Sequence, residues 1–257
     1  MLKHISGFIF DMDGVLFKDY TLLPGGRDMI EALKSKAIPF VFLSNLTTKS
    51  PSELHDILMS MGIYVDKEQI ITSATLIREY LKENFKGANV KVFGSKSLKS
   101  YIYEEHRVGF LEADVIVIGM DPDISISDLS KIRKHIHEGK EVIFSNPDYY
   151  APTSTGYDFD CGVIVELFKP HLNGEPKIIG KPSSYAFEYA ISKLNVPREF
   201  VAMIGDTYET DIKGAHNCGI IPIHIQTTQD ESYNTIKLDA YEYSSLEEVY
   251  TEFKSCF

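Results

Sequence analysis

Two carboxylates two positions apart, Asp11 and Asp13, follow the apolar run 7–10 and precede Gly14. At the end of a strand such a pair competes for protons unless a cation lies between them. Oxygen ligands of this kind suit Mg²⁺, which proteins hold with one or two carboxylates, water and substrate phosphate. Gly14 lets the backbone turn sharply beside a ligand. An acidic surface turn or a calcium loop explains the same four residues equally well.

Two other apolar runs end in groups that suit a bound phosphate. Ser44 and Asn45 follow the run 40–43, where a hydroxyl and free backbone amides can bind a phosphoryl oxygen. Lys181 lies between a glycine and a proline, on a constrained turn where its ammonium can attract an anion. A polar turn and a surface lysine are the ordinary explanations of these residues taken singly.

A second acidic cluster follows the apolar run 201–204. Asp206 comes directly after that strand and can complete a hard-cation site with Asp11. Asp211, five positions later, would begin the next helix, where it can cap backbone N–H groups and orient its neighbours. Two helix-capping acids are the alternative interpretation.

The elements that position these groups alternate between strands and helices. We expect strands at 7–10, 40–43, 70–72, 90–93, 115–118, 142–144, 201–204 and 220–225. Their consecutive apolar residues favour a sheet covered on both faces. Between them lie helix signals such as Ser50 and Glu53, a capping box with Pro51 in the first turn. The alternation predicts an α/β fold with a mostly parallel sheet, whose ligands bind beyond the carboxyl ends of the strands.

Composition narrows the class of protein. The chain has 257 residues and a formal net charge of −11. No apolar run is long enough to span a bilayer, and the N-terminal residues do not read as a secretory signal. The absence of a Lys/Arg cluster argues against nucleic acid as a partner. Cys161, Cys218 and Cys256 are widely spaced, which indicates reduced thiols and a cytoplasmic location.

The order of these groups resembles the haloacid dehalogenase-like phosphohydrolase superfamily. The run Asp11–Gly14 is similar to its first motif, Ser44 to the second, Lys181 to the third, and Asp206 with Asp211 to the fourth. The segments 44–47, 119–121, 146–148, 180–183 and 205–212 also resemble the NagD-like, or 4-nitrophenylphosphatase-like, subfamily. The resemblance covers the chain from about residue 7 to about residue 225.

The resemblance implies a fold and a domain organisation. It implies a Rossmann-like, mostly parallel sheet core built from residues 1–80 and 178–257, with an inserted α/β cap domain at 81–177. The sequence departs from relatives at 46–48, which replace a run of Asn and Ser, and at 159–163, which replace a small-residue stretch of the cap. The second departure lies where the leaving group is expected.

The resemblance also implies Mg²⁺-dependent hydrolysis of small-molecule phosphate monoesters. Asp11 would be the nucleophile, Asp13 the acid and base, and Ser44 and Lys181 would hold the phosphoryl oxygens. The implied metal site combines the Asp11 side chain, the Asp13 backbone carbonyl and Asp206. Gly14 and Asp211 would support it.

Further expectations concern the substrate contacts of the cap, the binding partner and the oligomeric state. Asn146 and Asp148, which follow a cap strand, are candidates for substrate contact together with Asn45, Ser44 and Lys181. A structural turn is the alternative for the two cap residues. The expected partner is a small phosphate ester, with no membrane or nucleic acid, and the family admits a homodimer.

Three other functions fit the same groups. A phosphomutase or phosphotransferase would use the same phosphoaspartate but return the phosphoryl group to a substrate. A signalling receiver would hold a long-lived phosphoaspartate without turnover, although it needs no cap. A non-catalytic binding protein would keep the fold alone.

Overall fold

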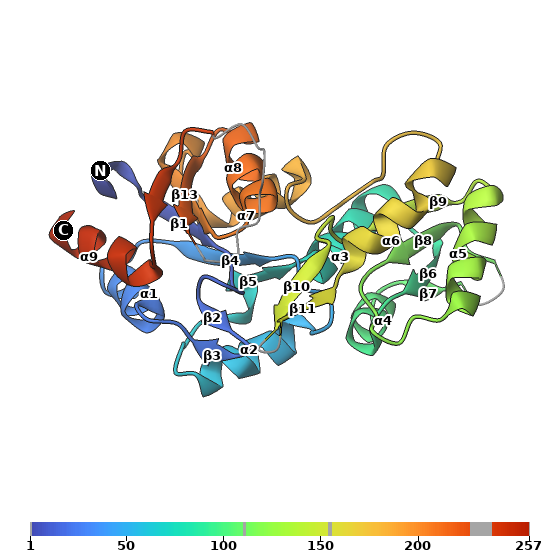
Figure 1. The fold of residues 1–257 in the computed structure, drawn as a ribbon, viewed down its shortest axis with the longest axis horizontal. Helices are drawn as coiled ribbons and strands as arrows, with labels where there is room; N and C mark the ends of the chain where they lie inside the picture. Colours follow the sequence, from blue (N-terminus) through green and yellow to red (C-terminus); the bar gives the residue numbers. More distant parts are fainter. Residues whose placement is uncertain (1, 110–111, 154–155, 227–237, 257) are drawn as a thin grey trace.

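Two lobes, each built on a parallel sheet, make up the protein (Figure 1). The computed structural model describes residues 2–109, 112–153, 156–226 and 238–256. Both ends of the described chain lie on the larger lobe, away from the smaller one (Figure 1). Within these ranges, none of the helices combines the length and the apolar character that crossing a bilayer requires.

The larger sheet has six strands in the order β14-β13-β12-β1-β4-β5, all parallel. Its strands are β1 (Gly7–Phe10), β4 (Phe40–Ser44), β5 (Ile70–Thr72), β12 (Val201–Gly205), β13 (Ile221–Ile225) and β14 (Tyr241–Tyr243). The smaller sheet has four parallel strands in the order β7-β6-β8-β9. They are β6 (Asn89–Phe93), β7 (Arg107–Val108), β8 (Val115–Ile118) and β9 (Glu141–Phe144). The predicted α/β class with a mostly parallel sheet is confirmed.

Helices cover both faces of the larger sheet. The side chains of Phe8 and Phe10 pack with α1, α2 and α9 on one face, whereas Ile9 packs with α3, α7 and α8 on the other. The helices of this lobe are α1 (Gly26–Ser35), α2 (Pro51–Ser60), α3 (Ser73–Asn84), α7 (Ser184–Leu194), α8 (Lys213–Asn217) and α9 (Leu246–Cys256). Short 3₁₀ turns are η1 (Leu2–His4), η2 (Lys67–Gln69), η3 (Lys169–His171) and η4 (Arg198–Phe200). This two-sided burial explains why the strands are apolar at consecutive positions.

The smaller lobe is made by the segment between α3 and α7. Its sheet carries α4 (Lys96–Tyr103) on one face, and α5 (Ile126–His137) and α6 (Cys161–Phe168) on the other. One face has an apolar cluster of its own, which includes Phe93 and Ile118. On the other face, Val90 and Val117 belong to a cluster that also contains Ile77 of α3 and Ile9 of β1. We call this second group the shared cluster, because it joins the hydrophobic cores of the two lobes.

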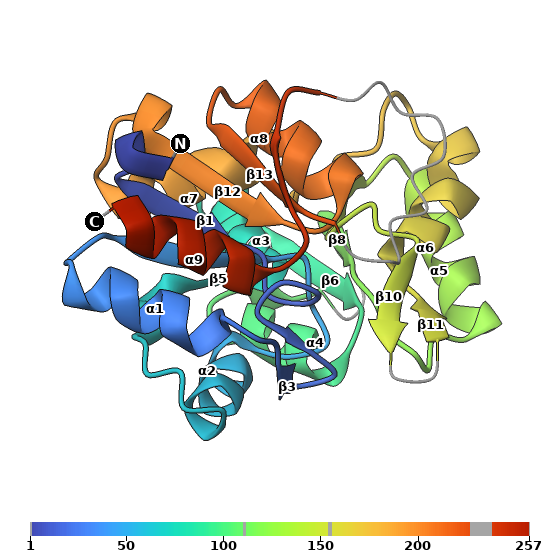
Figure 2. The same ribbon diagram turned by 60° about the vertical axis from the view of Figure 1, so that its left-hand side comes forward.

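Two antiparallel hairpins complete the fold. The first pairs β2 (Phe17–Lys18) with β3 (Thr21–Leu22) just after β1. The second pairs β10 (Tyr150–Thr153) with β11 (Gly156–Phe159) and belongs to the smaller lobe. Figure 2 shows this second hairpin on the side of the smaller lobe that meets the larger one. It therefore stands beside the carboxyl ends of the larger sheet.

Candidate active site

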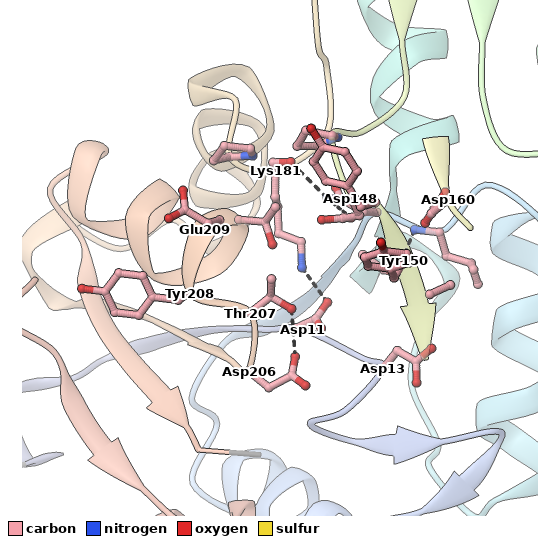
Figure 3. Close-up of a pocket in the computed structure, with 18 of the residues that line it drawn as sticks. Asp11, Asp13, Asp148, Tyr150, Asp160, Lys181, Asp206, Thr207, Tyr208 and Glu209 are labelled. Carbon is pink, nitrogen blue, oxygen red and sulfur yellow. Dashed lines mark hydrogen bonds and ion pairs between the residues drawn. The ribbon is translucent and has the colours of Figure 1, made fainter. Parts of the chain in front are cut away.

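The carboxyl ends of β1, β4 and β12 bring together the residues that the sequence singled out. β1 pairs in parallel with β4 on one side and with β12 on the other. Asp11 follows β1, Ser44 ends β4, and Asp206 follows β12, so their side chains meet at one edge of the sheet. All three line the same pocket (Figure 3).

Lys181 connects two of the acidic groups. Its side chain is almost completely buried, and its Nζ lies 2.5 Å from Oδ1 of Asp11 and 2.6 Å from Oδ1 of Asp211. Burial alone would lower the pKa of Lys181, but the carboxylates of Asp11 and Asp211 outweigh it and raise that pKa. The lysine is therefore a fixed cation beside Asp11.

A π-helical turn, η5 (Tyr208–Ile212), returns Asp211 toward the strand ends. The backbone N–H of Thr207 donates to Oδ2 of Asp211 at 3.1 Å, while the N–H of Asp211 donates to the carbonyl of Thr207 at 2.8 Å. Asp211 is fully buried. Both of its oxygens thus serve to hold neighbouring groups, Lys181 on one side and the 206–207 loop on the other.

The acidic groups outnumber the cation. One carboxylate oxygen each from Asp11, Asp206 and Asp211 lies within 4.8 Å of the others. Burial raises the pKa of Asp11 to about 7, against the opposing effect of Lys181. Burial and the neighbouring carboxylates of Asp11 and Asp211 raise the pKa of Asp206 well above its ordinary value. Two buried carboxylates and one half-buried carboxylate with one lysine fit a site that receives a further hard cation, and their oxygen ligands suit Mg²⁺.

Gly14 leaves room for this arrangement. Its φ of +82° lies in the region that favours glycine. A Cβ at this position would clash with the carboxylate of Asp206. The turn that follows β1 therefore approaches Asp206 as closely as the backbone allows.

Asp13 lies in the pocket wall rather than in the acidic cluster. Its side chain is half-buried, and Oδ1 has no hydrogen-bond partner in the described part of the chain. Burial, with a contribution from Asp19, raises the pKa of Asp13 to about 6. A carboxyl group that lines the pocket with a raised pKa and a partnerless oxygen is suited to hold and release a proton.

Polar residues of the smaller lobe reach the site through Asn45. Nδ2 of Asn45 donates to Oδ2 of Asp148 at 2.8 Å and to the carbonyl of Lys181 at 3.0 Å. Burial, and then the nearby Asp160, raises the pKa of Asp148 to about 7. Asp148 lines the pocket, as the sequence led us to expect for a substrate contact.

Asn146 has a different place from the one expected. It is fully buried, is not among the pocket-lining residues, and donates through Nδ2 to the carbonyl of Asn45 at 3.0 Å. Its Oδ1 accepts the N–H of Asp148 at 3.1 Å. Asn146 thus supports Asn45 and Asp148 from behind the wall instead of contacting the pocket.

The pocket between the lobes has a volume of about 790 Å³. Beyond the expected residues, its lining includes Tyr157, Asp160 and Glu209, which the sequence did not single out as a site. The signal that was available for the first two is the alternation of aromatic and polar residues at 157–160, next to Tyr149 and Tyr150. Figure 3 shows Tyr150 and Asp160 across the pocket from Asp206.

Comparisons with known proteins agree with this geometry. A family model described as haloacid dehalogenase-like hydrolase matches residues 8–107, and a second model, of haloacid dehalogenase hydrolase-like proteins, matches residues 178–240. An acid sugar phosphatase of Staphylococcus aureus (strain MRSA252) is 28% identical over 256 residues, which cover 98% of this chain and 99% of that protein.

Solved structures give the same picture. A 4-nitrophenylphosphatase from Thermotoga maritima superposes with a TM-score of 0.89 at 28% identity, over 97% of this chain and 98% of the other. A structure described as a putative NagD protein also gives a TM-score of 0.89 at 28% identity, over 98% of this chain and all of the other.

Proposed function

Because the chain belongs to the haloacid dehalogenase-like hydrolases and is a phosphoric monoester hydrolase, we propose that it cleaves small-molecule phosphate monoesters through a phosphoryl group carried on Asp11. The observation that carries this mechanism is the position of the Lys181 ammonium, 2.5 Å from Asp11 and 2.6 Å from Asp211, at the strand ends where Asp206 also lies.

In the first step an oxygen of Asp11 attacks phosphorus, and the bond from phosphorus to the ester oxygen breaks. Lys181 favours the ionised form of Asp11 against the effect of burial, and it faces the charge on the phosphoryl oxygens. The Ser44 hydroxyl, at the end of β4, binds one of those oxygens. Asp13 gives its proton to the departing oxygen.

In the second step water hydrolyses the aspartyl phosphate. The water oxygen bonds to phosphorus while Asp13, now a carboxylate, takes a proton from that water. The bond between phosphorus and the Asp11 oxygen breaks. Inorganic phosphate leaves, and Asp11 and Asp13 return to their starting states. The partnerless Oδ1 of Asp13 and its raised pKa, about 6, suit both proton transfers.

We further propose Mg²⁺ as the cofactor, held by the side chains of Asp11 and Asp206 and the backbone carbonyl of Asp13. A divalent ion at this place neutralises phosphate charge, so that one carboxylate can approach an anion that would otherwise repel it. Asp211 would hold Lys181 and the 206–207 loop in place.

The location and the assembly remain proposals of the same kind. Cys161, Cys218 and Cys256 are all free thiols, which supports a cytoplasmic location. A homodimer stays a prediction from the family, with size-exclusion chromatography and light scattering as its measurement.

The test of the function is release of inorganic phosphate from a panel of phosphate monoesters, with Mg²⁺ and with a chelator. We expect release that depends on Mg²⁺. Conversion of a sugar phosphate into its positional isomer without release would instead favour a phosphomutase. A stable phosphoaspartate without turnover would favour a signalling phosphoacceptor.

A further inference from the structure

The wall of the pocket that faces Asp11 from the smaller lobe is aromatic. Tyr150 and Tyr157, from β10 and β11, both line the pocket, and they are 59% and 48% exposed. In the register of the hairpin, Tyr150 lies opposite Phe159, and Tyr157 precedes Phe159 by two positions on β11, so the side chains of Tyr150, Tyr157 and Phe159 share one face. Large aromatic residues gathered on one exposed face require an explanation, because water solvates them poorly.

The rings are oriented by one another. The ring of Tyr150 stacks on that of Phe159, with centroids 5.9 Å apart and an interplanar angle of 26°, and meets Tyr157 edge-on at 6.2 Å. A ring held on two sides has few alternative positions, so it can offer a fixed surface to a ligand. Planar rings prefer such surfaces, through offset or edge-to-face contacts.

The charge around this wall is negative. Asp13, Asp148, Asp160 and Glu209 line the pocket outside the acidic cluster, and Lys181 is the one cationic side chain among the described lining residues. Lys181 already pairs with Asp11 and Asp211. Glu209 is partly balanced by Lys213 at 2.9 Å, and Asp148 accepts a hydrogen bond from Asn45. Asp13 holds the proton for the leaving group, which leaves Asp160 as the carboxylate that faces the ligand. A second anionic group on a substrate would therefore meet carboxyl groups and no available cation.

We propose that Tyr150 and Tyr157 are specificity-determining residues that bind a planar ring in the leaving group, and that Asp160 makes the pocket select a neutral or cationic ring over one with a second anion. This inference rests on the proposed phosphatase function and names the class of leaving group. Asp160 is suited to the second role because its Oδ1 is fixed by the N–H of Cys161 at 2.6 Å, at the start of α6.

Four esters of primary alcohols separate ring shape from charge and from leaving-group basicity. They are benzyl phosphate, cyclohexylmethyl phosphate, 4-(aminomethyl)benzyl phosphate and 4-carboxybenzyl phosphate. We expect kcat/KM for the benzyl ester to exceed that for the cyclohexylmethyl ester by roughly three- to tenfold. We expect the aminomethyl ester to exceed the carboxy ester by about tenfold.

Variants assign these preferences to residues. Tyr150→Ala should bring the benzyl-to-cyclohexylmethyl ratio close to one, and Tyr150→Phe should keep it. Asp160→Asn preserves a good helix cap and should reduce the preference for the aminomethyl ester. Tyr64→Ala removes a tyrosine that is equally exposed, at 57%, but lies outside the pocket, so both ratios should stay as in the wild type.

The outcomes keep the two proposals apart. If the wild type releases phosphate in the presence of Mg²⁺ neither from the four esters nor from the wider panel of phosphate monoesters, the phosphatase mechanism itself is wrong. If it releases phosphate from members of the panel but from none of the four esters, the specificity inference alone is overturned. If it releases phosphate but Tyr150→Ala lowers all four rates equally, or if the carboxy ester is the best substrate, the mechanism stands and the specificity inference is overturned.

Discussion

Asn45 and Asp148 lie 103 positions apart in the sequence, yet a hydrogen bond of 2.8 Å from Nδ2 of Asn45 to Oδ2 of Asp148 joins the two lobes. The same nitrogen donates to the carbonyl of Lys181. A polar residue of the smaller lobe therefore helps to fix the loop that carries Lys181.

The buried position of Asp148 predicts a pH-dependent stability. Burial and Asp160 raise its pKa to about 7 in the folded protein, whereas a carboxyl group in an unfolded chain ionises near pH ~3.9. Between these values the folded state binds the extra proton, so the free energy of unfolding falls as the pH rises. We expect the free energy of unfolding to fall less between pH 5 and 8 in Asp148→Asn, which can still accept the hydrogen bond from Asn45, than in the wild type. Thermal unfolding at several pH values measures this difference.

Asp123→Asn is the control for that experiment, because it removes the same charge from an exposed loop. It should follow the wild-type profile. Parallel profiles for wild type and Asp148→Asn would show that Asp148 does not carry the extra proton.

Replacement of the nucleophile should separate activity from folding. Asp11→Asn keeps the shape of the side chain and an oxygen for Lys181, while Asp211 still pairs with that lysine. We expect phosphate release to fall by roughly 10³-fold or more, with circular dichroism and cooperative unfolding retained. Wild-type turnover by a folded Asp11→Asn protein would exclude Asp11 as the nucleophile.

The acid and base role of Asp13 depends on the leaving group. An asparagine has no proton to give, but 4-nitrophenolate leaves without one. With 4-nitrophenyl phosphate, Asp13→Asn should still form the phosphoenzyme and then hydrolyse it slowly, so that an acyl phosphate accumulates and can be trapped after acid quench. With an alkyl phosphate the first step should fail. Equal defects on both esters, with no trapped intermediate, would remove Asp13 from this role.

Mg²⁺ should stabilise the protein as well as activate it. A cation that binds the folded state relieves the repulsion among Asp11, Asp206 and Asp211, and a ligand at a hundredfold excess over its Kd raises the melting temperature by roughly 5 °C in a chain of this size. Asp206→Asn should lose this response and should gain stability in the absence of metal. The same Mg²⁺ response in wild type and variant would place the ion elsewhere.

Alanine variants of two glycines with the same backbone conformation can separate the cost of backbone strain from the effect on the site. Gly14 and Gly87 both have φ near +82°, but a Cβ on Gly14 would clash with Asp206, whereas a Cβ on Gly87 meets nothing. Either alanine variant should cost about 1 kcal/mol of stability from the left-handed backbone. Gly14→Ala alone should also weaken Mg²⁺ binding and phosphate release. Isothermal titration calorimetry measures Mg²⁺ binding. Equal losses of Mg²⁺ binding and phosphate release in the Gly14 and Gly87 variants would contradict the steric argument.

Eight of the ten strands of the two sheets could be predicted from local sequence, because their apolar residues are consecutive and mostly buried; the short edge strands β7 and β14 are partly exposed and were not expected. Every expected strand occurs, with its ends shifted by at most one residue. The carboxyl ends of parallel strands meet at one edge, so strand positions placed Asp11, Ser44 and Asp206 at that edge. That they share one site was implied by the family resemblance, because strand positions do not give the order of the strands in the sheet.

What escaped prediction depends on contacts between distant segments. The strands β10 and β11 are short, and β11 is exposed throughout, so they lack the burial pattern that marks a strand. Asn146 faces inward because Asn45, 101 positions away, accepts its hydrogen bond. The placement of both depends on how one lobe docks on the other, which local sequence does not encode.

The shared cluster limits how far the smaller lobe can move relative to the larger one. A swing of the whole smaller lobe would pull Val90 and Val117 away from Ile77 and wet all three, at ~25 cal/mol for each Å² exposed. We therefore expect substrates to bind without such a swing, and both lobes to melt in one cooperative transition.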